Sequence, residues 1–279
     1  MGLIGGSFAK GLKKAGLVEE VMGFGHNSQN LQTAIELGVI DSFSLDMAEA
    51  VENSDLVFLA VPLGAMKKSL ELMKPYLSAK TIITDGGSAK SSVILSALEV
   101  FGELPVNFVP GHPIAGKEQS GVTAADEDLY IDHRVILTPN QNTTQDALQT
   151  VQDLWQALGA KVETMTAQQH DEIFAATSHL PHLLAFSLVD MLNEHEELGD
   201  VFQYTAGGFR DFTRIASSDA VMWRDIAVYN SEAIVKWLKN YGFAIEHLTK
   251  LIEAKDADGL YQLFDEAKKA RDKHIVNKR

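Results

Sequence analysis

The chain has 279 residues, 46% of them hydrophobic and 22% charged, which is typical of a globular protein that buries a full core. Its 24 Lys and Arg against 38 Asp and Glu give a net charge of −14, which argues against a nucleic-acid or anionic membrane surface. An anionic small substrate would need only a local positive pocket. The sequence has no cysteine, which excludes disulfides, thiol nucleophiles and thiolate metal sites. No apolar run approaches the roughly 18 residues of a membrane span and no signal peptide opens the chain, so we expect a cytoplasmic protein.

Short apolar runs alternate with helix-period stretches over the first 165 residues. Strands are predicted at residues 18–24, 55–61, 81–84, 106–109, 134–137 and 161–164, and helices at residues 28–37, 63–77 and 91–101. Residues 56–61 are continuously apolar, as in a strand that is covered on both faces. This alternation predicts βαβ units and a doubly wound, largely parallel sheet.

The pattern changes at residue 166. From there to residue 279 only Pro181 interrupts long helical patterns, and no clear strand signal remains. We therefore predict two domains, an α/β domain at 1–165 and an all-helical domain at 166–279. The second is too apolar for a lone bundle, notably at 234–238, 243–251 and 260–264, so we expect a homodimer with a two-fold interface through this domain.

The glycines at the start of the chain predict a dinucleotide site. Residues 2–7 read G-L-I-G-G-S, which matches the second half of a G-x-G-x-x-G turn. In such a turn the middle glycine lets the backbone approach the pyrophosphate, the last lets helix and strand pack closely, and the helix N-terminus supplies partial positive charge. Domain 1–165 is thus predicted to be a Rossmann-type dinucleotide-binding domain, with candidate contacts at Gly2, Leu3, Ile4 and Gly5. The first glycine and the strand before it are absent, so we expect an N-terminally shortened chain that lacks the first strand.

The choice between NAD and NADP stays open at this stage. An NAD-preferring strand usually ends in Asp or Glu, whereas Phe24 is followed by G-H-N-S, without an acid and without an arginine for a 2′-phosphate. His26 and Asn27 could serve either cofactor. Val61 and Pro62, at the end of the strand 55–61, are further candidate cofactor contacts.

Two polar clusters follow predicted strands, where ligands bind in open α/β sheets. They read T-D-G-G-S-A-K at 84–90 and P-G-H-P-I-A-G at 110–116. His112, expected in a loop, could take a proton from a hydroxyl while a nicotinamide takes the hydride, and the alternative is a loop histidine that bonds to backbone. Ser88 could bond to the imidazole or the substrate, or cap a helix.

Two more clusters lie in the helical domain, T-S-H-L-P-H at 177–182 and G-G-F-R-D-F-T-R at 207–214. A metal site at His179 and His182 lacks a convincing third ligand. Asp211 and Arg214 could form a simple surface pair, but among glycines and an aromatic residue the arginine makes a plausible carboxylate receptor. Trp223 fits the core or a pocket wall, and S-S-D at 217–219 fits a helix cap.

Five of these segments, in order along nearly the whole chain, resemble the prephenate dehydrogenase family, which includes arogenate and cyclohexadienyl dehydrogenases. They are G-L-I-G-G-S at 2–7, D-G-G-S-A-K at 85–90, G-H-P-I-A-G at 111–116, S-H-L-P-H at 178–182 and G-F-R-D-F-T-R at 208–214. The resemblance implies a Rossmann-type domain followed by a helical dimerisation domain. It also implies an NAD- or NADP-dependent oxidative decarboxylation in tyrosine biosynthesis, of prephenate to 4-hydroxyphenylpyruvate or of arogenate to tyrosine.

The resemblance also assigns residues, and it requires no metal. His112 matches the catalytic histidine that bonds to the ring hydroxyl, and Ser88 matches the serine that supports it. Arg214 matches the arginine that holds a carboxylate of the dianionic substrate, and Asp211 matches the acid beside that arginine. The other positions that match the substrate site are His182, Ser178, Gly207 and Trp223.

Two alternatives remain at this stage. A two-domain dehydrogenase of β-hydroxy acids would place a catalytic lysine early in the helical domain, where residues 171–192 contain none. A dinucleotide-binding regulator without activity is the non-enzyme alternative. The sequence leaves open the preference between prephenate and arogenate, a fused domain and inhibition by tyrosine.

Overall fold

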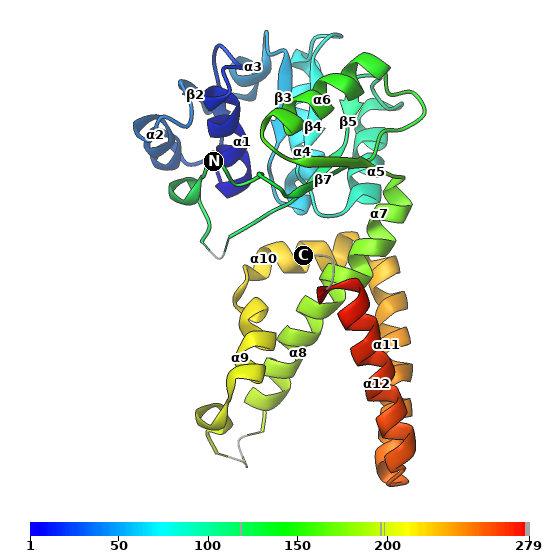
Figure 1. Ribbon diagram of the computed structural model, residues 1–279. Helices are drawn as coiled ribbons and strands as arrows, with labels where there is room; N and C mark the ends of the chain where they lie inside the picture. The colour runs from blue at the N-terminus through cyan, green and yellow to red at the C-terminus, as the bar shows by residue number, and fades with distance from the viewer. Residues whose placement is uncertain (118, 196, 198, 277–279) are drawn as a thin grey trace. The chain divides into compact units, whose positions relative to one another are not determined.

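A computed structural model describes residues 1–117, 119–195, 197 and 199–276. The chain divides into two compact units, Met1–Ser231 and Glu232–Arg279, whose parts are labelled in Figure 1. The division predicted at 165/166 lies inside the first unit and stays a prediction.

The first unit begins with alternating helices and strands. The strands are β1 (Met22–Phe24), β2 (Ser42–Ser44), β3 (Leu56–Leu59), β4 (Ile82–Asp85), β5 (Phe108–Val109), β6 (Gly111–Ile114), β7 (Arg134–Leu137) and β8 (Lys161–Thr164). Helix α1 (Leu3–Lys14) precedes β1, and the helices between strands are α2 (Ser28–Glu36), α3 (Met47–Val51), α4 (Leu63–Met73), α5 (Lys90–Phe101) and α6 (Gln145–Ala157). The predicted alternation of strands and helices is therefore confirmed.

The described strands form three sheets, in the orders β1–β2, β3–β4–β5 and β6–β7–β8. All of these pairs are parallel except β6–β7, which is antiparallel with His112 opposite Ile136. The expectation that His112 lies in a loop is wrong, because the histidine lies within β6. The strand escapes sequence analysis because its glycine and proline are turn signals, and an edge strand tolerates Pro113.

Aromatic packing fixes helix α1 on the α/β core. Phe8 of α1 contacts both Phe58 of β3 and Trp155 of α6, with ring centroids 4.5 Å apart in each pair. The hydroxyl of buried Tyr130 donates to the Ile4 carbonyl over 2.7 Å. The first turn of α1 is therefore held by contacts from residues distant in sequence.

Helices follow without further strands among the described residues. A continuous helical run comprises α7 (Ala167–Phe174), a π-helical turn (Ala175–His179) and α8 (Leu180–Asn193), which Figure 1 shows in green. After it come α9 (Gly207–Thr213), the 3₁₀ turn Arg214–Ser217 and α10 (Ala220–Tyr229). Asp219 accepts from the Met222 N–H over 2.7 Å, which confirms the predicted cap at 217–219.

The described residues of the second unit form two long helices. Nearly all of α11 (Ser231–Glu253) and all of α12 (Ala257–His274) belong to it, and Asp256 caps α12 through the Gly259 N–H. Large apolar side chains on these helices are exposed, among them Leu238, Phe243, Ile245, Ile252, Tyr261 and Phe264. No helix in the described part of the chain is long and apolar enough to cross a membrane.

Candidate active site

A buried ion pair holds the start of β6. The Asp85 carboxylate, at the end of β4, accepts hydrogen bonds from the backbone N–H groups of Gly87 (2.8 Å) and Gly111 (3.1 Å). Lys90 Nζ donates to this carboxylate and to the Gly111 carbonyl (2.6 Å). Both charged side chains are fully buried. The segment D-G-G-S-A-K thus supplies two charges that fix the residue preceding His112.

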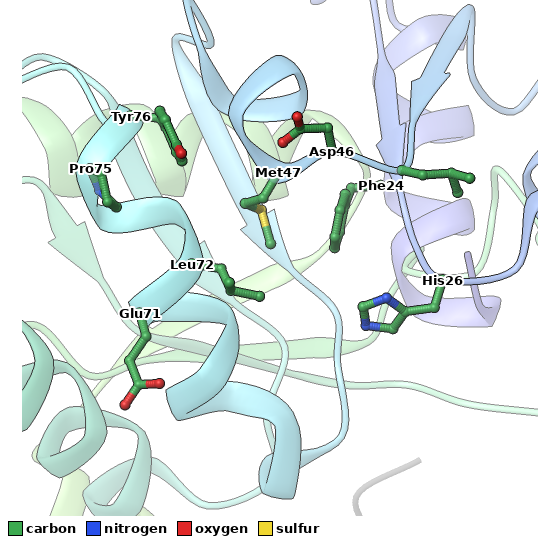
Figure 2. Close-up of a pocket in the computed structure, with 9 residues that line it drawn as sticks. Phe24, His26, Asp46, Met47, Glu71, Leu72, Pro75 and Tyr76 are labelled. Carbon is green, nitrogen blue, oxygen red and sulfur yellow. The ribbon is translucent and has the colours of Figure 1, made fainter.

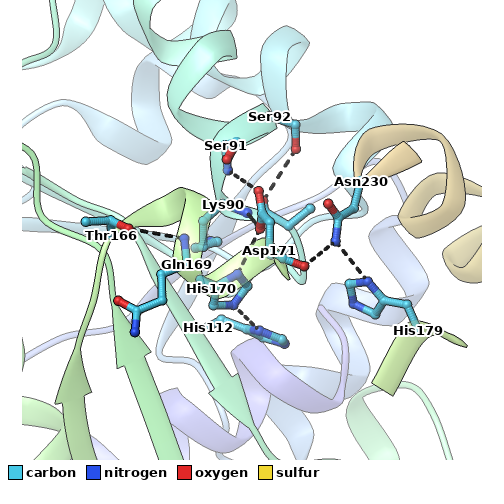
Figure 3. Close-up of polar contacts among 12 residues, drawn as sticks. Lys90, Ser91, Ser92, His112, Thr166, Gln169, His170, Asp171, His179 and Asn230 are labelled. Atoms are coloured by element: carbon cyan, nitrogen blue, oxygen red, sulfur yellow. Dashed lines mark hydrogen bonds and ion pairs between the residues drawn. The ribbon is translucent and has the colours of Figure 1, made fainter. Parts of the chain in front are cut away.

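His112 begins a row of three hydrogen-bonded side chains (Figure 3). Its Nδ1 lies 2.8 Å from His170 Nε2, and His170 Nδ1 lies 2.8 Å from Asp171 Oδ1. His112 is half-buried, whereas His170 and Asp171 are buried. The Phe174 ring packs against both imidazoles, with centroids 5.2 Å from His112 and 4.6 Å from His170. The row connects strand β6 to helix α7.

Asp171 also caps helix α5. Its two carboxylate oxygens accept from the backbone N–H groups of Lys90 (2.7 Å) and Ser91 (2.8 Å). Burial raises the pKa of the Asp171 carboxyl, but the hydrogen bonds from His170, Ser91 and Lys90 outweigh burial and leave the pKa below its ordinary value. The carboxylate is therefore ionised at neutral pH.

His112 is neutral at neutral pH. Burial lowers the pKa of its imidazole well below the ordinary value, and the positive charge of Lys90 lowers it further. A neutral imidazole has one nitrogen that can accept a proton, which a general base requires.

His179, in the π-helical turn, is tied to the end of α10. Asn230 Nδ2 donates to the Asp171 carbonyl over 3.0 Å and lies 3.1 Å from His179 Nδ1. Burial lowers the pKa of His179 to about 4. Asn230 therefore joins α7, the π turn and α10 at one point.

His182 and Trp223 form a stacked wall nearby. Their ring centroids are 3.9 Å apart and their planes differ by 20°. His182 Nδ1 lies 2.9 Å from the Ser178 carbonyl. Burial lowers the pKa of His182, and the positive charge of Arg214 lowers it further. Arg214 is therefore close enough to the His182 imidazole to affect its protonation. The structure thus brings four of the predicted substrate residues together.

The other predicted residues of this group lie on two elements. Ser88 is half-buried in the β4–α5 loop, and it is not the helix cap, since Ala89 occupies that position. Gly207 begins α9, and Asp211 is exposed on the same helix. The hydrogen bonds recorded for the described residues do not link Gly207 or Asp211 to His112.

The predicted cofactor residues at the start of the chain meet the β1–α2 turn. Helix α1 begins directly after Gly2. A Cβ on Gly5 would lie 3.0 Å from the Ala60 Cβ, so glycine allows the close approach of α1 to the segment after β3. The Met1 ammonium donates to the Asn30 side chain, and Met1 lies beside Gly25.

A cavity of about 680 Å³ lies beside this turn (Figure 2). It is lined by Phe24, His26, Leu45, Asp46, Met47, Glu71, Leu72, Pro75 and Tyr76. His26 is exposed and packs edge-on against Phe24, whereas the Asn27 side chain accepts from the Asn30 N–H and so caps α2. Val61 follows β3, and Pro62 is the residue before α4.

Sequence reasoning missed Asp85, Lys90, His170, Asp171 and Asn230. Asp85 and Lys90 are within a segment singled out for other reasons, where an acid and a lysine enclose two glycines. The adjacent His170 and Asp171 at the start of the helical region were a usable signal, whereas Asn230 carries none. No group of three or more His, Asp or Glu side chains within the described residues could hold a metal ion.

The α/β region contains a helix that begins just after a glycine, and a neutral histidine lies where this region meets the following helices. This arrangement is typical of a dinucleotide-dependent dehydrogenase. Comparison with known proteins gives the family. The sequence models named "Prephenate dehydrogenase, nucleotide-binding domain" and "Prephenate dehydrogenase, dimerization domain" match residues 8–164 and 166–266. The chain belongs to the prephenate dehydrogenase family, and the resemblance, fold class and enzyme class predicted from the sequence are confirmed.

Individual relatives agree with this assignment. The chain is 36% identical over 274 residues to the cyclohexadienyl dehydrogenase of Zymomonas mobilis, covering 97% of this chain and 92% of the relative. It is also 36% identical over 274 residues to the prephenate dehydrogenase of Bacillus subtilis, covering 98% and 74%. The crystal structure of prephenate dehydrogenase from Aquifex aeolicus in complex with hydroxyphenyl propionate and NAD+ superimposes with a TM-score of 0.91, at 36% identity, over 97% and 94% of the two chains.

Proposed function

We propose that His112 is the general base with which this enzyme oxidatively decarboxylates prephenate to 4-hydroxyphenylpyruvate. The observation that carries the assignment is the half-buried, neutral imidazole with one ring nitrogen bonded to His170. The other nitrogen, Nε2, would accept the proton of the substrate's ring hydroxyl.

The reaction requires a base and a substrate that is held in the correct orientation. When bound, the nicotinamide cofactor accepts the hydride that leaves the carbinol carbon. His112 takes the hydroxyl proton as the hydride leaves. The electron pair of the bond to the ring carboxylate then enters the ring as carbon dioxide departs, and the proton returns to the oxygen of the phenol. Aromatisation supplies the driving force, so orientation and carboxylate anchors are the main tasks of the remaining side chains.

Substrate anchoring is assigned to the wall around His182. Arg214 would hold a carboxylate with its planar fork, and Asp211 would lie beside it. Trp223 Nε1 is buried and has no hydrogen-bond partner in the described part of the chain, which fits a donor that a ligand satisfies. Ser178, His182 and Gly207 would complete the substrate side, and the Ser88 hydroxyl would support His112.

NAD is the proposed cofactor, held by Gly2, Leu3, Ile4 and Gly5 at the start of α1 and by His26, Asn27, Val61 and Pro62. A solved relative is described as a complex with NAD+. The cavity next to His26 is lined by two acids, Asp46 and Glu71, and by neither lysine nor arginine. This charge opposes the 2′-phosphate of NADP.

A homodimer through the helical domain 166–279 and a cytoplasmic location complete the proposal. The dimerization domain of the family and the exposed apolar residues on α11 and α12 support the dimer. Arogenate is the second candidate substrate, because one relative is named cyclohexadienyl dehydrogenase.

The test is formation of reduced cofactor, followed by absorbance, with each pairing of prephenate or arogenate with NAD or NADP. We expect the highest kcat/KM with prephenate and NAD, and near-total loss in His112→Asn. A purified, folded protein without activity on either substrate would contradict the function, and a preference for NADP would contradict the cofactor assignment alone.

A further inference from the structure

In the row His112, His170, Asp171, the direction of each hydrogen bond follows from the contacts of Asp171, the last residue of the row. Asp171 accepts from the backbone N–H groups of Lys90 and Ser91, and a backbone N–H can only donate. These two donors favour the ionised carboxylate, which has no proton to give. His170 Nδ1, 2.8 Å from Asp171 Oδ1, must therefore carry a hydrogen and donate it.

The next bond is then determined. Burial lowers the pKa of His170, although Asp171 opposes this, so the ring is neutral and carries a single N–H. Because that hydrogen is on Nδ1, His170 Nε2 is an acceptor. His112 Nδ1, 2.8 Å away, must donate to it. A neutral His112 with its hydrogen on Nδ1 has its lone pair on Nε2.

We propose that Asp171 and His170 are positioning residues that fix His112 in the Nδ1–H tautomer, so that Nε2 is the nitrogen that accepts the substrate proton. The inference rests on the proposed function, in which His112 is the base. It adds two residues of helix α7 to the machinery of a base that lies on strand β6.

The same row stabilises His112 during turnover. When Nε2 takes the hydroxyl proton, the imidazole of His112 becomes positively charged while its Nδ1–H stays bonded to His170. The negative Asp171 carboxylate, on the far side of the His170 ring, stabilises that positive charge, because electrostatic interactions are strong between buried groups. Phe174 lies against both rings and limits their rotation.

A purely structural role predicts something different. Asp171 caps α5, and His170 fills a buried position between α7 and β6. If these were their only tasks, any side chain of suitable size at position 170 would serve equally well. A pair of variants at this position separates the two roles.

His170→Gln keeps an acceptor, because its amide oxygen can occupy the place of Nε2 and accept from His112 Nδ1. His170→Leu has similar bulk and no acceptor. Loss of tautomer control in a catalytic histidine costs up to about 10⁴ in kcat. We expect kcat to fall by about tenfold in His170→Gln and by about 100-fold or more in His170→Leu, with KM values for prephenate and NAD within about threefold of wild type. Exposed Gln168 on the same helix gives the control, Gln168→Ala, with wild-type kcat.

Equal kcat values in the two His170 variants would overturn the proposal. A second measurement reads the tautomers in the wild-type enzyme and uses the variants only to assign the signals. In wild-type enzyme labelled with ¹⁵N-histidine, nitrogen–proton correlation spectra report which ring nitrogen carries the hydrogen, and loss of signals in His112→Asn and His170→Gln assigns the two rings. We expect hydrogen on Nδ1 of both, and an Nε2–H form of His112 would overturn the proposal.

The results also separate this inference from the proposed function. If His112→Asn retains turnover, the base assignment fails. If His112→Asn is inactive while His170→Leu matches Gln168→Ala in kcat, only the tautomer proposal fails.

Discussion

The Lys90 ammonium and the Asp85 carboxylate form an ion pair in which neither side chain has any solvent exposure. Burial lowers the pKa of Lys90, and the charges of Asp85 and Asp171 oppose that shift. Together the pair bonds to both the N–H and the carbonyl of Gly111. The residue before the proposed base lies opposite Leu137 of β7, and its own N–H and carbonyl are held by these two charges.

Lys90→Met tests this pair. Removing the ammonium leaves a buried, uncompensated carboxylate, and such losses cost about 3–5 kcal/mol of unfolding free energy. Lys67, which pairs with Glu99 on the surface, provides the control, because Lys67→Met should cost less than about 1 kcal/mol. Urea unfolding of both variants gives the comparison, and a similar small loss in each would show that the buried pair does not hold the strand.

His112→Asn removes the proposed base. We expect kcat to fall by roughly 10²–10⁴, the usual contribution of a positioned base, with a smaller change in substrate affinity. Steady-state kinetics with prephenate and binding of substrate by titration calorimetry give the two quantities. Turnover near that of wild type would remove His112 from the base position.

Arg214→Ala separates recognition from catalysis. An arginine that holds a carboxylate equally in ground and transition states changes KM and leaves kcat nearly intact. We expect the KM for prephenate to rise by the equivalent of about 2–3 kcal/mol, the value of a charge-assisted hydrogen bond. Arg210, also exposed and one turn earlier, is the control, and Arg210→Ala should leave KM unchanged. A simple surface pair with Asp211 predicts under about 1 kcal/mol for Arg214→Ala and no kinetic effect.

The pH dependence of stability should carry a contribution from His179. Its pKa is lowered from 6.5 to about 4 by burial, so between these pH values the unfolded chain binds a proton that the folded chain does not. The unfolding free energy therefore falls as the pH drops through 6.5 and has lost about 3 kcal/mol from this residue near pH 4.

The variant His179→Asn cannot titrate, yet its amide oxygen can replace Nδ1 as the acceptor for Asn230. Urea unfolding at several pH values should show a shallower loss in this variant than in wild type. Parallel curves would mean that His179 keeps an ordinary pKa in the folded protein.

Association through the helical domain can be measured directly. Light scattering at micromolar concentration should give the mass of a dimer. Phe243 of α11 is 69% exposed within one chain, so Phe243→Asp should favour the monomer if that side chain is buried against a second copy. Lys250→Asp on the same helix is a charge-changing control. A monomeric wild type would contradict the proposed dimer.

The sequence predicted the elements with strong periodicity and missed those held by distant contacts. The bounds of strands β7 and β8 coincide with the prediction. The sequence of each strand is either largely apolar or alternates between apolar and polar residues, and this pattern breaks at both ends of the strand. Strand β2 escapes the prediction because three residues, S-F-S, give no periodicity. The helix at 91–101 was predicted to within one residue, yet its cap, Asp171, lies 80 positions away from Ser91 and no local pattern could indicate it.

The candidate site shows the same division. Motifs with glycine and proline around a histidine indicated His112 and His182, because such clusters are unusual outside functional loops. The partner of His112 lies 58 positions further along, and which nitrogen faces which neighbour depends on the packing of α7 against β6. Sequence alone therefore gives the reacting residue but not the side chains that orient it.

Strand β6 is also protected against aggregation. The Thr138 N–H donates to the Pro110 carbonyl across the ladder. Because backbone groups of successive residues in an antiparallel pair point alternately toward and away from the partner strand, the backbone groups of Gly111 and Pro113 point away from β7. An exposed edge of this kind would invite a strand from another molecule, whereas Gly111 and Pro113 are both buried. Here the N–H and carbonyl of Gly111 are taken by Asp85 and Lys90, and Pro113 has no N–H to offer. The edge that carries the proposed base thus offers no free N–H to an intruding strand, and the same ion pair that fixes the histidine also keeps neighbouring molecules from extending its sheet.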